Sequence, residues 1–281
     1  MKKKTIKRVC EIAGVGVHSG QNVNLALCPS DAGYIEFIRT DLDNAVIKID
    51  PRKIEANYST TLRDKNLTIQ TIEHLLAVLY VLGIDSLSIK LNGSEIPILD
   101  GSAEPFVRLI QDVGTRELSK EKQKISVLKS FHIQEEDGDA SISVEPADDY
   151  FISYIIEYDH PLLKRQDIDL SINSNVFIKE IAPARTFGFL KDVPAIRSQG
   201  LALGGSLENA LILDEENVIN GPLRFPDEFV RHKVLDFIGD FSLLGYSVTG
   251  HFKAYKAGHF LHHKLVLFLL DNPDYWSLDY S

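Results

Sequence analysis

The chain opens with a strand-like pattern of hydrophobic and polar residues. Runs rich in β-branched and apolar residues predict strands over 5–17, 22–29 and 33–41. Residues 59–71 predict a hairpin, with Asp64, Lys65 and Asn66 near its turn. The beginning of the chain is therefore expected to be mainly β.

Helical spacing then replaces this pattern. Apolar residues recur three and four positions apart from Ile72 to Leu82, and Gly83 is typical of a helix end. A cleanly alternating segment predicts a strand over 85–92, and a second helix is expected over 103–114.

A polar stretch divides the chain. Residues 115–124 contain almost no bulky apolar side chains, so we expect a linker there. It would separate an N-terminal α+β domain, residues 1–118, from a C-terminal α+β domain, residues 125–281.

The second half repeats the order of strands followed by helices. Strands are expected over 125–134, 140–147, 150–159 and 167–173. A helix through 176–181 has Ser174 or Asn175 as its expected cap, and a long helix is expected from Pro226 to about Leu244. Residues 183–225 between these helices are irregular and rich in glycine.

A weak internal repeat relates the two halves. The segments "EHLLAVLYVLGIDSLSIKLNG" and "RHKVLDFIGDFSLLGYSVTGHFKA" both run from a histidine through an apolar helix and Leu-Gly to a strand. Two related α+β halves fit this pattern, and a chance similarity between two amphipathic helices is the alternative.

Composition and charge exclude several classes of protein. The net charge of −10 argues against general nucleic-acid binding, which needs clustered positive charge. Two cysteines are too few for a disulfide framework, and the basic start has no apolar stretch behind it. The longest apolar run, residues 75–84, is shorter than a membrane span. We therefore expect a cytoplasmic protein without stable membrane insertion.

The long helix of the second half carries a row of polar residues at steps of four, namely His232, Asp236 and Asp240. Phe229 and Leu243 share that side of the helix, which indicates a buried or half-buried site where unpaired carboxylates are costly. A divalent cation bound by His232 and Asp236 would remove this cost. An ordinary hydrogen-bonded i,i+4 pair is the alternative.

The helix of the first half offers a complement in Glu73 and His74. Adjacent helical side chains diverge by about 100°. One of the two could therefore bind a metal while the other faces a reacting molecule. A favourable first-turn acid beside a helix-surface histidine is the alternative.

Taken together, the motifs resemble the UDP-3-O-acyl-N-acetylglucosamine deacetylases, zinc amidases at the committed step of lipid A synthesis. The matching stretches are "GVGVHSG" (14–20), "TIEHLLAVLYVLGID" (71–85), "EIPILDGSAEPF" (95–106), "ARTFGF" (184–189), "RSQGLALGGSLENA" (197–210), "LRFPDEFVRHKVLDFIGD" (223–240) and "YKAGHFLHHKL" (255–265). The resemblance implies two related two-layer βααβ sandwich domains, with helices packed between the sheets and the active site at the domain interface.

The resemblance also implies the metal ligands. They would be His74, His232 and Asp236, with Zn²⁺ as the cofactor. Three protein ligands and a water match a catalytic zinc site. Mixed nitrogen and oxygen ligation leaves Fe²⁺ as an alternative.

The resemblance further implies four catalytic roles. Glu73 would be the general base toward the attacking water, and Thr186 would donate a hydrogen bond to the tetrahedral oxyanion. His259 would be the general acid toward the amine leaving group, with Asp240 as its partner. If His259 lies in the first turn of a helix, the helix dipole opposes its positive charge, and Asp240 must outweigh that effect.

Substrate contacts are expected from the same motifs. Lys233 resembles a positioning lysine, while Phe187, Phe189 and Tyr158 are expected to face the substrate in part. A βαβ insertion over about 188–222 would form a passage for the fatty acyl chain, lined by residues such as Ile196, Leu201, Leu203 and Ala210. His18 is expected near the cleft without being a main ligand. The remaining histidines are expected to be structural or surface residues, namely His132, His160, His251, His262 and His263.

The sequence therefore predicts a metal-dependent hydrolase that removes the N-acetyl group of UDP-3-O-(3-hydroxyacyl)-N-acetylglucosamine. Its partner would be this UDP-linked small molecule rather than nucleic acid, and the enzyme is expected to be a monomer in the cytoplasm of a Gram-negative-type bacterium. Two alternatives stay open: a related metallo-deacetylase of another N-acylated sugar nucleotide, and a non-enzymatic protein with a structural metal.

Overall fold

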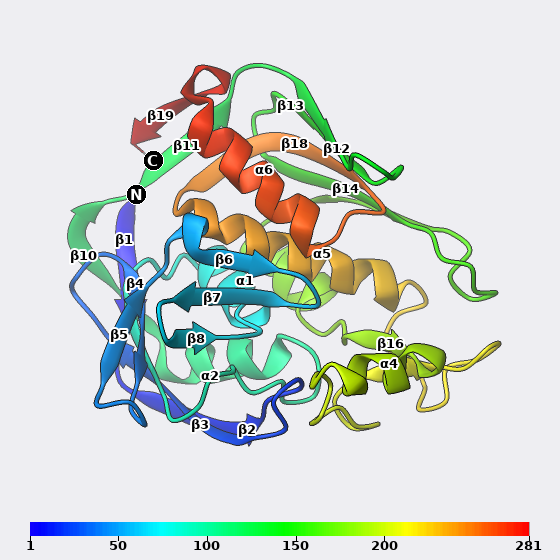
Figure 1. The fold of residues 1–281 in the computed structure, drawn as a ribbon. Coiled ribbons are helices and arrows are strands. Elements are labelled where there is room, and N and C mark those ends of the chain that lie inside the picture. Colours follow the sequence, from blue (N-terminus) through cyan, green and yellow to red (C-terminus); the bar gives the residue numbers. More distant parts are fainter. Residues whose placement is uncertain (281) are drawn as a thin grey trace.

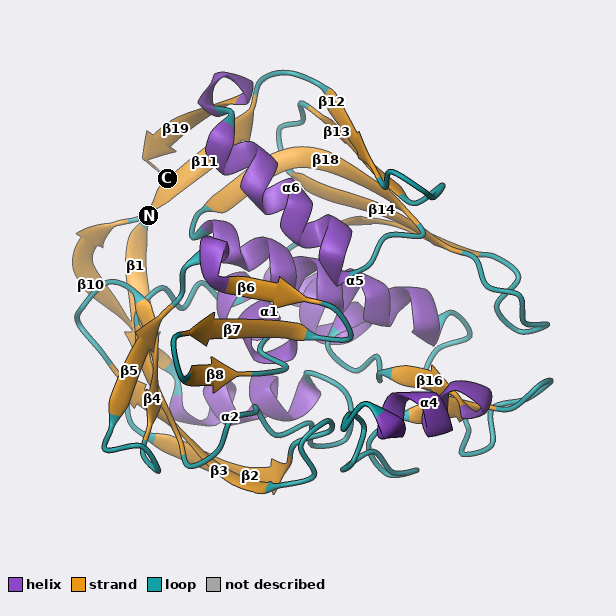
Figure 2. Cartoon of the chain, in the orientation of Figure 1, coloured by secondary structure: helices purple, strands orange, loops and turns teal. Residues whose placement is uncertain are grey.

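Helices lie between two β-sheets in this protein. The computed structural model describes residues 1–280 and shows a mixed fold of strands and helices (Figures 1 and 2). The α+β prediction is confirmed, whereas the division into two domains stays a prediction.

Strands of the first half form a five-stranded and a three-stranded sheet. The five-stranded sheet has the order β2-β3-β9-β4-β5, made of Cys10–Val15, Asn22–Pro29, Leu87–Leu91, Ile35–Arg39 and Ala45–Lys48. The three-stranded sheet has the order β6-β7-β8, made of Ile54–Ala56, Thr60–Asp64 and Leu67–Ile69. Lys65 adopts a positive φ of 54° between β7 and β8, so the predicted hairpin is confirmed.

Strands of the second half form a seven-stranded sheet around β18. Its members are β11 (Gln123–Val127), β12 (Phe131–Gln134), β13 (Ser141–Glu145), β14 (Tyr150–Ile156), β15 (Gln166–Ser171), β18 (Ser247–Tyr255) and β19 (Trp276–Tyr280). Strand β18 runs parallel to β14, as β9 runs parallel to β4 in the other sheet. The two halves therefore share the helix-to-central-strand step that the internal repeat indicates.

The expected linker is extended and hydrogen-bonded. Residues Thr115–Glu121 form β10, which pairs with β1 (Lys2–Ile6), and β11 starts at Gln123. Leu118 is the only buried residue of β10, which explains why the segment is polar in sequence. A strand that buries only one side chain can be as polar in composition as a loop, so the sequence does not distinguish the two.

The helices begin and end close to the predicted positions. They are α1 (Glu73–Val81), α2 (Glu104–Val113), α3 (Ser174–Val176), α4 (Val193–Ser198), α5 (Glu228–Phe241) and α6 (His259–Asp271). Gly83, Gly114 and Gly245 follow α1, α2 and the 3₁₀ turn after α5 with positive φ, a conformation that glycine adopts at low cost.

Two predicted helix starts are wrong by one or two residues. Asn173, rather than Ser174 or Asn175, caps α3, because its side chain accepts hydrogen bonds from the backbone amides of Asn175 and Val176. The chain then continues as a π-helical turn over Phe177–Ile181. Helix α5 begins at Glu228 rather than at Pro226.

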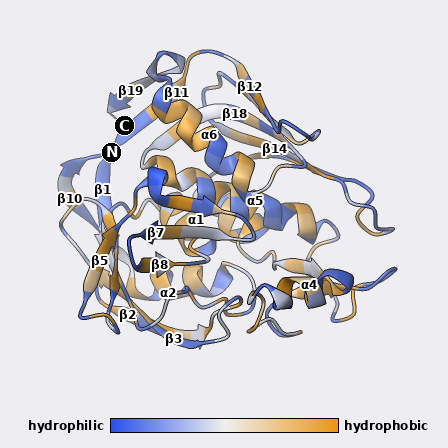
Figure 3. Cartoon of the chain, in the orientation of Figure 1, coloured by the Kyte–Doolittle hydropathy of each residue, from blue (hydrophilic) through white to orange (hydrophobic). Residues whose placement is uncertain are grey.

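One continuous apolar core joins the helices to both large sheets. Figure 3 shows hydrophobic residues concentrated on the helices and strands of the interior, with hydrophilic residues along the outer loops. None of the helices within residues 1–280 combines the length and the apolar character that a membrane crossing requires.

Gly239 allows a close approach between α1 and α5. A Cβ atom at this position would lie 2.1 Å from the backbone oxygen of Glu73, a separation that side chains do not adopt. The N-terminus of α1 is therefore pressed against the last turn of α5. This contact places Glu73 and His74 beside the polar row of α5.

Gly239→Ala is expected to lower the free energy of unfolding by about 1–3 kcal/mol, because the added methyl group forces the two helices apart. Chemical denaturation of both proteins measures this difference. Gly205→Ala is the matched control, since its Cβ would meet the Ala202 oxygen at an ordinary 3.4 Å. Equal stability of wild type and Gly239→Ala would contradict the close contact.

Candidate metal centre and its pocket

Residues from α1 and α5 meet in one buried cluster. Donor atoms of His74, His232 and Asp236 all lie within 4.8 Å of one another, and all three residues are buried. His74 comes from the first turn of α1, while the other two are one turn apart on α5. The structure thus brings together the three residues expected as ligands.

The cluster has the dimensions of a tetrahedral site. Asp236 Oδ1 lies 3.6 Å from His74 Nε2 and 3.4 Å from His232 Nε2. Ligand atoms about 2.0–2.1 Å from a zinc ion in tetrahedral geometry are about 3.3 Å apart. The donor atoms present therefore fit a divalent metal ion of this kind.

Neighbouring groups hold the ligands in the forms that bind a metal. His232 Nδ1 lies 3.1 Å from the Ala184 carbonyl oxygen and donates to it, which leaves Nε2 free as the ligand atom. Burial lowers the pKa of His232 to about 3, so its imidazole is neutral. Burial opposes the charge of Asp236, but Lys233 Nζ, 2.9 Å from Oδ2, holds the pKa of this carboxyl well below its usual range.

Glu73 faces this cluster without belonging to it. One of its oxygens, together with oxygen of Asp236 and ring nitrogen of His259, falls in a second group within 4.8 Å. Its Oε2 accepts a hydrogen bond from the Thr60 amide at 3.0 Å. Burial raises the pKa of Glu73 to about 7 against the opposing charges of His259 and His74. Such a carboxyl can take up and release a proton near neutral pH.

Asp240, the third member of the polar row, binds two histidines of α6. Its Oδ2 accepts from His259 Nδ1 at 2.7 Å and from His262 Nδ1 at 2.8 Å. Its Oδ1 accepts from the hydroxyl of Thr60. The contact between Asp240 and His259 matches the expected pairing.

His259 is the first residue of α6, where the helix dipole disfavours a positive charge. Burial would also lower its pKa, but the charge of Asp240 and the hydrogen bond to it raise the pKa of His259 to about 9. The same contact lowers the pKa of Asp240 to about 2 against the effect of burial. His259 is therefore an imidazolium at neutral pH.

Two residues of this group, His262 and Thr60, were not predicted as members from the sequence. His262, expected to be a structural or surface residue, is fully buried and bonded to Asp240, and Thr60 reaches both Asp240 and Glu73 from β7. The spacing of His259 and His262 in "HFLH" could have indicated that both face one partner, because residues three apart share a helix face. No local pattern marks Thr60.

A cavity of about 570 Å³ opens beside the cluster. Its polar end contains Glu73, His74, Thr186, His232, Lys233, Asp236 and His259. Its apolar part is lined by Phe187, Phe189, Leu190, Val193, Ile196, Leu207, Ala210, Ile212 and Ile219. The cavity therefore joins a metal-binding end to an apolar one.

Most of the apolar lining comes from residues 188–222. Strands β16 (Phe187–Phe189) and β17 (Leu211–Leu213) pair in parallel, with α4 between them in the chain. Ile196 and Ala210 line this cavity, whereas Leu201 lines a neighbouring one and Leu203 is exposed. Leu203 packs instead near Gly20.

The expected substrate-facing residues form one aromatic group. Tyr158 lies 5.9 Å from Phe187 and 5.5 Å from Phe189, measured between ring centroids. Unlike these two residues it does not line the cavity, so its expected direct contact with the substrate is not supported, and it packs against their rings instead. Lys233 Nζ lies 5.8 Å from the centroid of Phe187. His18 also reaches the cavity, and its Nδ1 accepts from the Ala202 amide at 3.3 Å.

The chain is similar to known proteins over nearly its whole length. Residues 3–271 match the family model described as UDP-3-O-acyl N-acetylglycosamine deacetylase. A UDP-3-O-acyl-N-acetylglucosamine deacetylase of Myxococcus xanthus (strain DK1622) is 44% identical over 280 residues, covering 98% of this chain and 88% of the relative. Relatives with the same name from Geotalea uraniireducens (strain Rf4) and Acidithiobacillus ferrooxidans (strain ATCC 53993 / BNL-5-31) are 43% and 42% identical, covering 98% and 100% of this chain and 91% and 94% of their own lengths.

Proposed function

The chain belongs to the UDP-3-O-acyl N-acetylglycosamine deacetylase family, and from this membership we infer that it is a deacetylase of lipid A biosynthesis. It hydrolyses the N-acetyl group of UDP-3-O-acyl-N-acetylglucosamine and releases acetate. The observation that carries the proposal is the buried His74, His232 and Asp236 cluster at the polar end of an apolar cavity. This arrangement suits a substrate that carries both an amide bond to be hydrolysed and a separate fatty acyl chain.

We propose that His74, His232 and Asp236 hold Zn²⁺, with Fe²⁺ as the alternative that the same donors admit. When bound, a divalent ion of this kind acidifies water and polarises a carbonyl oxygen. A structural zinc usually has four protein ligands, and the cluster within residues 1–280 has three. This count favours a catalytic site over the structural-metal alternative.

Glu73 is the proposed general base. Its buried carboxylate faces the metal cluster, and the Thr60 amide fixes one of its oxygens, so the other can accept a proton from the attacking water. A pKa of about 7 matches this task at neutral pH. Attack on the acetyl carbonyl then gives a tetrahedral oxyanion.

Thr186 is the proposed donor to that oxyanion. Its amide donates to the Gly101 oxygen at 2.8 Å and its carbonyl accepts from the Leu211 amide at 2.8 Å, so the backbone is fixed on both sides. A fixed donor stabilises developing charge without reorganisation.

His259 is the proposed general acid. It carries its proton at neutral pH because Asp240 stabilises the imidazolium, and it borders the cavity with its Nε2 4.0 Å from Asp236 Oδ2. Transfer of this proton to the leaving nitrogen releases the free amine and acetate. Lys233, Phe187 and Phe189 are proposed to contact the sugar nucleotide, with Tyr158 supporting the two rings.

The deacetylation rate with and without a 3-O-acyl chain tests this function. Each methylene removed from the acyl chain is expected to weaken binding about fourfold, since burial of one methylene contributes about 0.8 kcal/mol. The change should appear in KM for a series of acyl lengths, with kcat nearly constant. UDP-N-acetylglucosamine, which lacks the chain, is the matched control. Equal kcat/KM for both substrates would favour the alternative of another N-acylated sugar nucleotide.

The dependence of kcat/KM on pH is expected to be bell-shaped. Glu73 must lose its proton, which gives a rising limb, and His259 must keep its proton, which gives a falling limb. Their pKa values of about 7 and about 9 are upper bounds for the two limbs, because a bound cation favours the deprotonated form of each.

Asp240→Asn identifies the falling limb. Removing the negative charge lowers the pKa of His259, so the falling limb should move to lower pH. The rising limb should move less, because Asp240 affects the pKa of Glu73 less than burial and the two histidines do. A falling limb that does not move in Asp240→Asn would contradict the assignment of His259. The cytoplasmic location and the monomeric state stay predictions.

A further inference from the structure

Residues 183–186 connect the metal cluster to the cavity. The Ala184 oxygen accepts from His232 Nδ1 at 3.1 Å, and Thr186 borders the cavity two residues later. The position of this short segment therefore sets both the orientation of a proposed metal ligand and the position of the proposed oxyanion donor.

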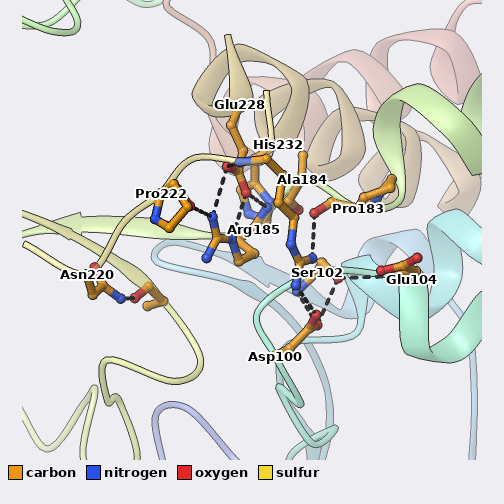
Figure 4. Close-up of polar contacts among 12 residues, drawn as sticks. Asp100, Ser102, Glu104, Pro183, Ala184, Arg185, Asn220, Pro222, Glu228 and His232 are labelled. Carbon is orange, nitrogen blue, oxygen red and sulfur yellow. Dashed lines mark hydrogen bonds and ion pairs between the residues drawn. The ribbon is translucent and has the colours of Figure 1, made fainter. Parts of the chain in front are cut away.

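A single buried carboxylate holds this segment to α5. Glu228, whose side chain is 0% exposed, accepts at Oε1 from the Arg185 amide at 3.1 Å and from Arg185 Nε at 2.8 Å. Its Oε2 accepts from Arg185 Nη2 at 3.1 Å and from the Arg224 amide at 2.6 Å. Figure 4 shows the Arg185 and Glu228 side chains pointing toward one another beside His232 and Ala184.

Arg224 extends the same network to the first half of the chain. Its Nη1 donates to the Pro183 oxygen and its Nη2 to Asp100 Oδ2, both at 2.8 Å. Arg185 Nη2 also donates to the Pro222 oxygen at 2.8 Å. The segment is thus fixed at consecutive residues, and Glu228 is the acceptor shared by both arginines.

We propose that Glu228 is a positioning residue of the metal centre, which acts through Arg185 on Ala184 and Thr186. Glu228 lies one helical turn before His232 on α5. One helix therefore carries both the metal ligand and the carboxylate that aligns the Ala184 carbonyl behind that ligand. The proposal rests on the proposed function only for the role of Thr186. The role toward His232 depends on metal binding alone.

The hydrogen bonds of Glu228 make its positioning role separable from a general contribution to stability. A carboxylate has acceptors on both oxygens, and all four hydrogen bonds to Glu228 use them. In Glu228→Gln the volume is kept, but one oxygen becomes an amide that faces N–H donors. Arg185 must then move, and the Ala184 carbonyl moves with its neighbour.

The test compares Zn²⁺ affinity, by competition with a chelator, in wild type, Glu228→Gln and Asp227→Asn. The control removes another carboxylate from the same end of α5, since Asp227 pairs with Arg231 and, within residues 1–280, its side chain makes no hydrogen bond or ion pair to residues 183–186. Glu228→Gln is expected to bind Zn²⁺ about 10- to 100-fold more weakly, the usual effect of losing a partner behind a metal ligand. Its kcat should also fall with little change in KM, whereas Asp227→Asn should match wild type.

Wild-type Zn²⁺ affinity in folded Glu228→Gln would overturn the proposal, as would an equal loss in Asp227→Asn. If Glu228→Gln does not fold, Arg185→Lys decides, because it keeps the charge but loses the two-pronged contact. It should weaken Zn²⁺ binding several-fold, and unchanged affinity would overturn the proposal. If wild type binds Zn²⁺ but does not deacetylate the UDP-sugar, the proposed function fails while the affinity ratio still tests Glu228.

Discussion

Glu73→Ala is expected to lower kcat for deacetylation by about two to four orders of magnitude, the usual contribution of a general base. The bound metal should stay at its wild-type level, because Glu73 is outside the cluster of His74, His232 and Asp236. Metal analysis of the purified variant, together with its deacetylation rate, measures both quantities.

Glu73→Gln is the matched variant for this experiment. It keeps the size of the side chain and can still accept the hydrogen bond from the Thr60 amide, but it cannot take a proton. Both variants should therefore be impaired to a similar degree. Loss of metal together with activity would instead assign Glu73 to the metal ligands.

Asp236→Asn is expected to have the opposite signature, in which metal and activity are lost together. Asp236 supplies the anionic oxygen that faces both imidazoles, while its second oxygen holds Lys233. A neutral amide leaves the lysine beside the cation site without its partner, so bound metal is repelled. We expect kcat/KM to fall by about three orders of magnitude or more, since the activation of water depends on the metal.

Chelated wild-type protein is the reference for Asp236→Asn. Added Zn²⁺ should restore deacetylation to the chelated wild type, but only partly to the variant at much higher metal concentration. Stoichiometric metal in Asp236→Asn as purified would contradict the assignment of Asp236 as a ligand.

Features set by local spacing could be predicted from the sequence. His232, Asp236 and Asp240 repeat at steps of four, and a helix of this regularity places them on one side. The hairpin over β7 and β8 and the glycine after α1 follow from turn chemistry in the same way. The assignment of His74 as a partner of the row came from the family resemblance, because adjacent Glu and His on a helix have no unique meaning.

Features set by long-range packing could not be predicted in this way. Thr60 is distant in sequence from Asp240, and only the folding of the whole chain brings the two together. Glu228 resembles an ordinary first-turn acid in sequence, where a helix favours a negative charge. Its burial depends on two arginines from separate loops. Charged residues of this kind reveal their role only when their partners are known.

Thr60 has a consequence for how the enzyme can vary. Through its amide it holds the proposed proton acceptor, and through its hydroxyl it holds the carboxylate behind the proposed proton donor. Both ends of the proton path are thus anchored to one point on a short hairpin. A substitution that shifts this strand would therefore move the proton acceptor and the partner of the proton donor together. A change in only one of them must come from the helices that carry these residues.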